Sequence, residues 1–208
     1  MEPITKGANG PARFAPYAKI RTDSYILLAS LLGQRPSENL LKILQELRWD
    51  KSIPQGVGSA LSALRLASHE YPLSALEEEY DELFVGLGSG ELVPYASWYK
   101  EKRIQSLPLA SLRSDLMLLG IVRQADSRES EDHAAALCEC MALISRQSND
   151  ILPKEQAKFF QQHVAPWMMA FFKDLESAKS ARFYRTVGIF GSHFLESEIE
   201  YLNYGGGA

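Results

Sequence analysis

FYRTVGIFGSHFLESEIEY, residues 183–201, is the stretch that indicates the fold class most directly. Its large apolar side chains recur every three or four residues, the spacing that places them on one face of an α-helix. They are Phe183, Val187, Phe190, Phe194 and Tyr201. In a half-buried strand, apolar residues would alternate with polar ones instead. The stretch is therefore predicted to form a long helix with one buried face.

The same helical period continues toward the N-terminus. It predicts a helix from Ala18 to Gly33, a second helix capped by Ser37, and a third from about Gly58 to Tyr71. Ser74 is expected to cap the next helix, because Glu77 follows it at capping-box spacing.

Prolines and polar residues indicate the helix ends in the second half. Pro108 suits the first turn of one helix, and Pro153 is expected to open another. Pro166 lies inside a helical pattern, so it predicts a kink or a break near Ala165. A further helix is expected to begin near Ser130.

These segments predict one all-α domain of about eight or more helices. The domain is expected to span residues 17–204, behind a flexible N-terminal arm over residues 1–16. Residues 124–130 form a polar linker inside it. No fixed-period internal repeat and no alternation of strands with helices is found.

The composition excludes several classes of function. A net charge of −4 over 208 residues argues against nucleic-acid binding, which depends on basic surface. No run of about 18 apolar residues exists, so no stable membrane insertion is expected. The two cysteines, Cys138 and Cys140, are too few for a disulfide framework and suit a reducing cytoplasm. Neither is assigned a role, and the chain has no Arg-Arg pair of its own.

The first candidate site is an aromatic loop that follows the helix ending near residue 86. In the run from Glu79 to Tyr99, the loop combines three glycines and a proline with Trp98 and two tyrosines, Tyr95 and Tyr99. Such rings either pack the loop onto the body or face a partner. The glycines of residues 86–90 lack the preceding strand and the following Gly-Lys-Ser/Thr of a phosphate loop, so no nucleotide cofactor is expected.

The second candidate is Glu131-Asp132-His133, expected in a helix first turn, where acidic residues complement the macrodipole. Asp132 and His133 also permit an alternative reading as a helical metal-dependent hydrolase. Metal ligation needs more ligands, and the other histidines, His69, His163 and His193, are each isolated in their segments.

Three segments, taken in order, resemble the TorD/DmsD family of redox-enzyme maturation chaperones. They are Tyr80-x-x-Leu83-Phe84 with Gly86-x-Gly88 and Pro94-Tyr95-x-Ser97-x-Tyr99, then Glu131-Asp132-His133, then Phe160, His163 and Trp167 followed by Phe183-Tyr184. The resemblance spans roughly residues 20–200. One departure is the absence of the proline that the family often carries just before the Asp-His pair.

The resemblance implies a cytoplasmic, non-enzymatic chaperone without cofactor. Its implied partner is the precursor of a molybdopterin-containing oxidoreductase, whose twin-arginine signal peptide it would bind before cofactor insertion and export. The implied peptide-binding residues are Tyr80, Leu83, Phe84, Pro94, Tyr95, Trp98, Glu131, Asp132 and His133. The family also forms domain-swapped homodimers, which a linker such as 124–130 would permit.

A twin-arginine peptide presents a basic motif and then an apolar segment. An apolar cleft between the loop at 85–99 and the helix beginning near 130 would hold the apolar segment, and Asp132, Asp81 or Glu82 would bind the guanidinium groups. Asp132→Ala is expected to weaken binding and leave the fold intact, as a first-turn residue contributes little. The main alternative is a NarJ-like chaperone of a molybdoenzyme that is not exported.

Overall fold

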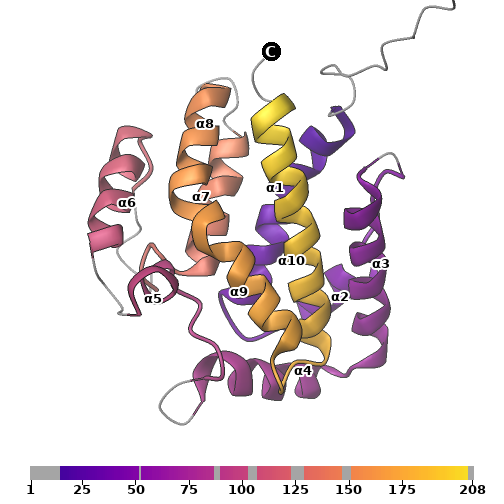
Figure 1. Cartoon of the computed structure of the whole chain (residues 1–208). Coiled ribbons are helices and arrows are strands. Elements are labelled where there is room, and N and C mark those ends of the chain that lie inside the picture. Colours follow the sequence, from indigo (N-terminus) through magenta and orange to yellow (C-terminus); the bar gives the residue numbers. More distant parts are fainter. Residues whose placement is uncertain are drawn as a thin grey trace, which may run out of the picture.

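The computed structural model describes residues 15–51, 53–86, 90–102, 107–122, 129–146 and 151–205 (Figure 1). Within these ranges the chain is helical and forms no strand, apart from an isolated bridge between Tyr95 and His133. The all-α prediction is therefore confirmed. Residues 1–14 of the predicted arm, 87–89 of the glycine run and 123–128 of the linker lie outside the described residues. The single-domain organisation and the domain-swapped homodimer stay predictions.

The first half of the described chain forms α1 (Ala15–Leu32), α2 (Glu38–Gln45), α3 (Gln55–Glu70), α4 (Leu73–Tyr80) and the π-helical turn η2 (Asp81–Val85). The second half forms α5 (Ala96–Glu101), α6 (Leu107–Leu118), α7 (Ala134–Arg146), α8 (Pro153–Phe159), η3 (Phe160–Val164), α9 (Ala165–Ser177), α10 (Phe183–Glu200) and η4 (Tyr201–Gly205).

The core forms around α10, which contacts α1, α3 and α9. Its predicted apolar face is confirmed, since Phe183, Val187, Phe190 and Phe194 are fully buried. In Figure 1, α4 crosses the lower ends of α3, α9 and α10, while α6 lies at the outer edge. Helix α1 packs along α7, a pairing that becomes important below.

A buried ion pair fixes α1 against α10. Arg21 Nη2 lies 2.6 Å from Glu198 Oε1, and both side chains are almost fully buried. The hydroxyl of Tyr17 donates to Glu198 Oε2 at 2.9 Å. Because every partner is satisfied inside the core, α1 has one defined position relative to the rest of the bundle.

Two predicted helix starts are wrong, and those marked by Ser37, Pro108 and Pro153 are confirmed. Ser37 caps α2 as expected, with its Oγ accepting from the amide of Leu40 at 3.2 Å. Ser74 caps nothing, because α4 begins directly after Pro72 and Ser74 already lies in its first turn. Helix α7 begins at Ala134 rather than near Ser130, because the preceding backbone pairs with a different segment.

The predicted kink at Pro166 is confirmed as a change from π-helical η3 to α9. Proline removes the amide that would bond to the carbonyl of Gln162. Lys100 Nζ from α5 donates to that carbonyl at 3.1 Å. Trp167 Nε1 similarly donates to the carbonyl of His163 at 2.8 Å. The kink therefore serves to attach α5 to the bundle.

Candidate functional site

Two segments that are distant in the sequence meet where the chain enters α5 and α7. The amide of Ala96 donates to the carbonyl of Asp132 at 2.9 Å, and the amide of Ala134 donates to the carbonyl of Pro94 at 2.8 Å. We call residues 94–97 and 129–134 the bridge site. It brings together five of the predicted binding residues: Pro94, Tyr95, Glu131, Asp132 and His133. The predicted proximity of the loop and the start of α7 is confirmed.

Asp132 anchors the bridge site from inside. Its side chain is 1% exposed, and Oδ2 accepts from the amide of Ser97 at 3.1 Å in the first turn of α5. Its second oxygen, Oδ1, is buried and has no hydrogen-bond partner among the described residues. The premise of the Asp132→Ala expectation, a position in the first turn of α7, is therefore wrong, because Asp132 precedes α7 and its carboxylate accepts from the first turn of α5.

His133 caps α7 with its ring. Nδ1 accepts from the amide of Ala135 at 3.1 Å, so the ring must be neutral with its proton on Nε2. The ring meets that of Tyr95 edge-on, with centroids 4.9 Å apart. Burial lowers the pKa of His133, although the negative charges of Glu129 and Asp132 oppose that shift. The neutral form is therefore the one that the fold uses.

Carboxylates surround Tyr95 of the bridge site and the neighbouring Tyr80 of α4. The hydroxyl of Tyr95 donates to Glu129 Oε2. Burial, and then the charges of Glu129 and Asp81, raise the pKa of Tyr80 to about 12. Burial and the same Glu129 raise the pKa of Tyr95. The negative potential of Glu129 thus reaches both aromatic rings, an environment that favours a cationic ligand.

Glu131 already binds a guanidinium group. Arg113 of α6 donates from Nε to Oε1 at 3.0 Å and from Nη2 to Oε2 at 2.9 Å. This is the two-pronged geometry by which carboxylates recognise arginine. The Glu131 side chain is 13% exposed, so most of its surface is covered.

Tyr80, Leu83 and Phe84 pack the aromatic loop onto the body. Leu83 is fully buried, and the hydroxyl of Tyr80 donates to the carbonyl of Leu32 at the end of α1, at 3.2 Å. The ring of Phe84 lies edge-on to Tyr80 at 5.0 Å. A Cβ on Gly90 would lie 2.4 Å from the carbonyl oxygen of Leu83, so the returning loop needs glycine there. These rings therefore pack against the body of the protein instead of facing a partner.

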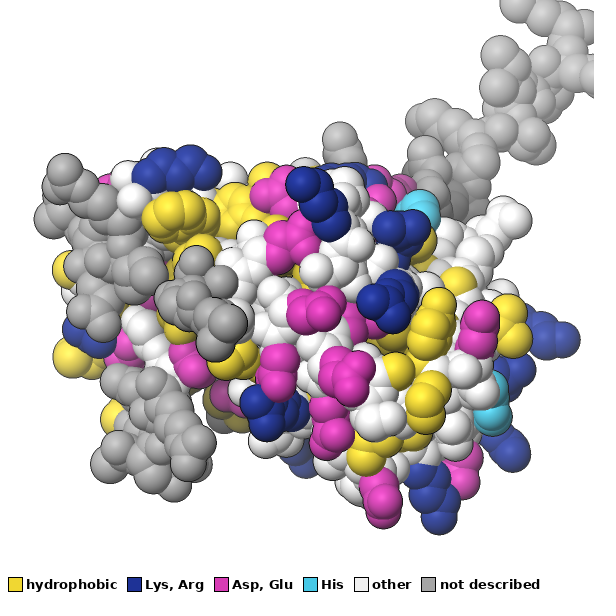
Figure 2. Space-filling model, turned by 90° about the horizontal axis from the view of Figure 1, so that it is seen from below, with side chains coloured by type: hydrophobic (Ala, Val, Ile, Leu, Met, Phe, Trp, Pro, Cys, Tyr) yellow, Lys and Arg dark blue, Asp and Glu magenta, His cyan; other side chains and the backbone are white. Residues whose placement is uncertain are grey.

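The remaining predicted residues lie at the surface. Trp98 is half-buried on α5, with Lys102 Nζ 5.6 Å from its ring centre. Asp81 forms an ion pair with Arg35 at 2.6 Å, and Glu82 is exposed. Figure 2 shows acidic side chains gathered across the face on which α4 lies. This acidic surface suits a basic partner.

The geometry does not favour the hydrolase alternative. His133 Nδ1 and Asp132 Oδ2, the atoms that would bind a metal, both accept from backbone amides. Among the described residues, no three His, Cys, Asp or Glu side chains are grouped closely enough to hold a metal ion. Cys138 is fully buried, and burial raises the pKa of its thiol.

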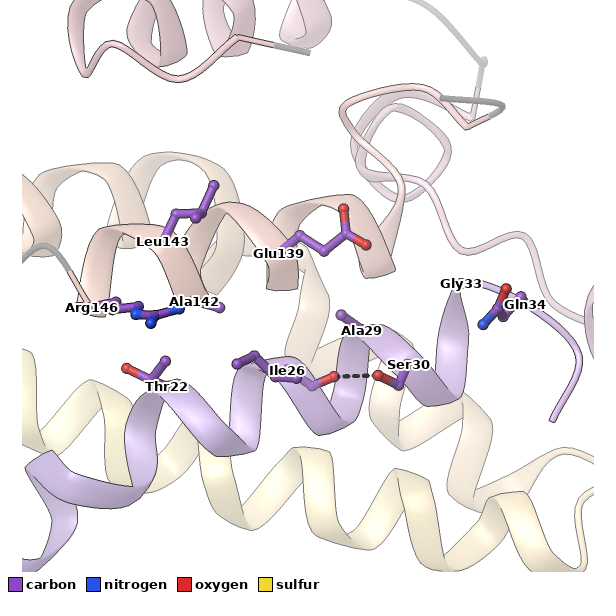
Figure 3. A pocket seen from close by; sticks show the side chains of 10 residues that line it. All are labelled: Thr22, Ile26, Ala29, Ser30, Gly33, Gln34, Glu139, Ala142, Leu143 and Arg146. Carbon is purple, nitrogen blue, oxygen red and sulfur yellow. Dashed lines mark hydrogen bonds between the residues drawn. The ribbon is translucent and has the colours of Figure 1, made fainter. Parts of the chain in front are cut away.

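A hollow that the sequence did not predict lies between α1 and α7 (Figure 3). This α1/α7 groove has a volume of about 440 Å³. Its apolar walls include Ile26 and Leu143, which are 48% and 46% exposed. Both side chains lie outside the buried faces of their helices. An apolar residue at such a position was the sequence feature that could have indicated the groove. Arg113 was missed because only a tertiary contact brings it to the bridge site. Glu129 was missed because its role depends on the tertiary hydrogen bond from Tyr95, although it lies two residues before Glu131 in the sequence.

Comparisons with known proteins identify the class. The model of one protein family, described as nitrate reductase delta subunit, matches residues 50–173. No curated protein matches the chain. A solved structure of a candidate redox enzyme maturation protein from Archaeoglobus fulgidus has a similar fold, with a TM-score of 0.57 and 21% identity. The match covers 85% of this chain and 94% of that one.

The chain is therefore a member of the redox-enzyme maturation chaperones. Within that class it belongs to the nitrate reductase delta subunit family. No helix in the described part of the chain combines the length and apolar character needed to cross a membrane.

Proposed function

We propose that this protein is a cytoplasmic, non-catalytic chaperone that binds the twin-arginine signal peptide of a molybdoenzyme precursor. It would retain the precursor until the molybdopterin cofactor is inserted and then release it for export. Membership of the maturation chaperone family supports the general role. The bridge site supports the recognition of a basic peptide.

The observation that carries the proposal is the concentration of carboxylates in the bridge site. Glu129, Glu131 and Asp132 lie within four residues of one another, beside the ring of Tyr95. Within the described part of the chain no donor reaches the buried Oδ1 of Asp132, an arrangement that costs free energy until a donor arrives. Arg113 on Glu131 illustrates how a guanidinium from a client would bind.

Calorimetric titration with a synthetic peptide tests this proposal. The peptide carries two adjacent arginines followed by about 12 apolar residues, the length of a typical signal-peptide core. We expect saturable binding that weakens about tenfold or more when both arginines become alanine, through loss of charge-assisted hydrogen bonds. Equal binding of the two peptides would remove arginine recognition from the account.

Asp132→Asn is the matched variant for this experiment. The asparagine carboxamide oxygen can still accept from the amide of Ser97, so the cap on α5 is retained. The negative charge is lost. We expect weaker binding of the arginine peptide and unchanged binding of the alanine peptide. Unchanged affinity for both peptides would exclude Asp132 from the binding site.

A chaperone of a non-exported molybdoenzyme is the second candidate function. It is supported by the description of the matching family as nitrate reductase delta subunit. Such a chaperone would bind a client segment without paired arginines. Strong binding of the alanine peptide, equal to that of the arginine peptide, would favour this second function.

A further inference from the structure

The α1/α7 groove is open, elongated and mainly apolar in its walls. Figure 3 shows Ala142 and Arg146 of α7 on the side toward α1, and Glu139 and Leu143 on the outer rim of the groove. Ile26 of α1 lines the groove with them. Ile26 and Leu143 expose nearly half of their surfaces to water. This exposure does not stabilise the fold, because apolar side chains contribute to stability when they are removed from water.

The hydroxyl groups beside the groove are bonded within the protein. Ser30 Oγ donates to the carbonyl of Ile26 at 2.9 Å (Figure 3). Thr22 Oγ1 and Ser145 Oγ lie 2.8 Å apart in a mutual hydrogen bond. These walls therefore present mainly carbon to a ligand.

Two residues of opposite charge lie at separate points along the groove. Glu139 and Arg146 both line it and are both exposed. Neither forms an ion pair with any residue in the described ranges. They are seven residues apart on α7, which places them on one face and about 10 Å apart along the axis. Desolvation raises the pKa of Glu139, so a cation nearby would stabilise its charged form.

The acidic end of the groove adjoins the bridge site. Gly33 and Gln34 line that end, and a Cβ on Gly33 would lie 3.2 Å from the Cβ of Ala135 in the first turn of α7. Ala135 follows directly after His133 and Ala134 of the bridge site. A peptide held at the bridge site could therefore continue into the groove.

We propose that the α1/α7 groove binds the apolar segment that follows the paired arginines of the signal peptide, as a helix running from Glu139 toward Arg146. This inference rests on the proposed function and assigns a second surface to the same ligand. In this orientation the basic flank lies at Glu139, and the negative C-terminal end of the helix dipole lies at Arg146. Ile26 and Leu143 contact the apolar face of the helix.

Leu143→Asp tests the groove by titration with the same arginine peptide. A carboxylate in the apolar wall would oppose burial of the ligand, so we expect affinity to fall about tenfold or more. Leu66→Asp is the matched control, because Leu66 of α3 is 71% exposed and lies outside the groove. It should bind as the unmodified protein does. Circular dichroism of both variants checks that the helices are retained.

Photo-crosslinking tests the orientation. A reactive group beside the arginines should label residues near Gln34 and Glu139, and one at the far end of the apolar segment should label residues near Thr22 and Arg146. The reverse pattern, or labelling outside α1 and α7, would overturn the assignment.

The outcomes separate this inference from the proposed function. If the unmodified protein binds the peptide and Leu143→Asp binds it equally well, the groove assignment fails and signal-peptide recognition stands. If the unmodified protein does not bind the peptide at all, both fail.

Discussion

The bridge site and the α1/α7 groove adjoin one another and differ in almost every physical respect. Asp132 and His133 of the bridge site are buried, and they use their side chains to cap helices. The groove is open, and Glu139 and Arg146 have no ion-pair partner in the described part of the chain. The residues of the sequence motif thus build a rigid frame, while less conspicuous residues form the accessible surface.

This difference shows that the residues of a binding motif can themselves expose little surface to a ligand. A carboxylate that is 1% exposed can contribute to recognition only through a small opening or through the position of its neighbours. An exposed leucine in a groove contributes area directly. Substitutions should therefore separate into two groups, those that change stability and those that change binding.

The largest change in stability is expected for Asp132→Ala. The substitution leaves the amide of Ser97 without its acceptor at the start of α5. We expect a loss of about 1–3 kcal/mol in the free energy of unfolding, the usual cost of such an unsatisfied group. Urea denaturation measures it, with Asp132→Asn as control. A loss below about 0.5 kcal/mol, the usual scatter of surface substitutions, would contradict the capping role.

A smaller loss is expected for Tyr95→Phe. The ring and its contact with His133 are retained, and only the hydrogen bond to Glu129 disappears. We expect a decrease of about 1.5 kcal/mol in unfolding free energy, the lower end for a hydrogen bond to a charged group. Denaturation in urea again gives the value, and an unchanged midpoint would show that this bond contributes nothing.

Acid should weaken the bridge site further through His133. Burial lowers its pKa in the folded state below the ordinary value of 6.5, so the folded protein favours the neutral ring. The stability that depends on the neutral ring is complete above pH 6.5 and is lost as pH falls toward the folded pKa. Burial also lowers the pKa of His163, which contributes in the same direction.

Thermal denaturation between about pH 7.5 and about pH 5, a range that spans the ordinary histidine pKa, checks this expectation. His133→Asn can still cap α7 through its side-chain oxygen and does not titrate. The variant should lose less stability in acid than the unmodified protein. Parallel curves for the two proteins would contradict the role of His133.

The smallest change in stability is expected in the groove. Arg146→Gln removes an exposed charge that forms no ion pair within the described residues. We expect its unfolding free energy to change by less than about 0.5 kcal/mol, while peptide affinity decreases. A clear loss of stability in this variant would show that Arg146 supports the fold, which would contradict this account.

Local sequence patterns predicted most of the helical framework. The buried stripe of α10, the cap at Ser37 and the kink at Pro166 all follow from contacts within a few residues. The Ser74 cap failed because Pro72 offers a competing helix start two residues earlier. These features depend on local chemistry, which a sequence shows directly.

The start of α7 and the groove depend on distant contacts. Residues 130–133 stay outside the helix because their backbone and side chains bond to residues 94–97. Ile26 and Leu143 form one groove only because α1 packs along α7. The motif residues could therefore be named from the sequence, while their burial and the open surface beside them could not.

The central claim is that a twin-arginine peptide extends from the bridge site into the α1/α7 groove. Chemical-shift mapping of the ¹⁵N-labelled protein titrated with the arginine peptide tests it most directly. The account predicts that the largest shifts fall in residues 22–34 and 129–146. Shifts confined to α3, α8 or α10, with those two ranges unperturbed, would contradict it.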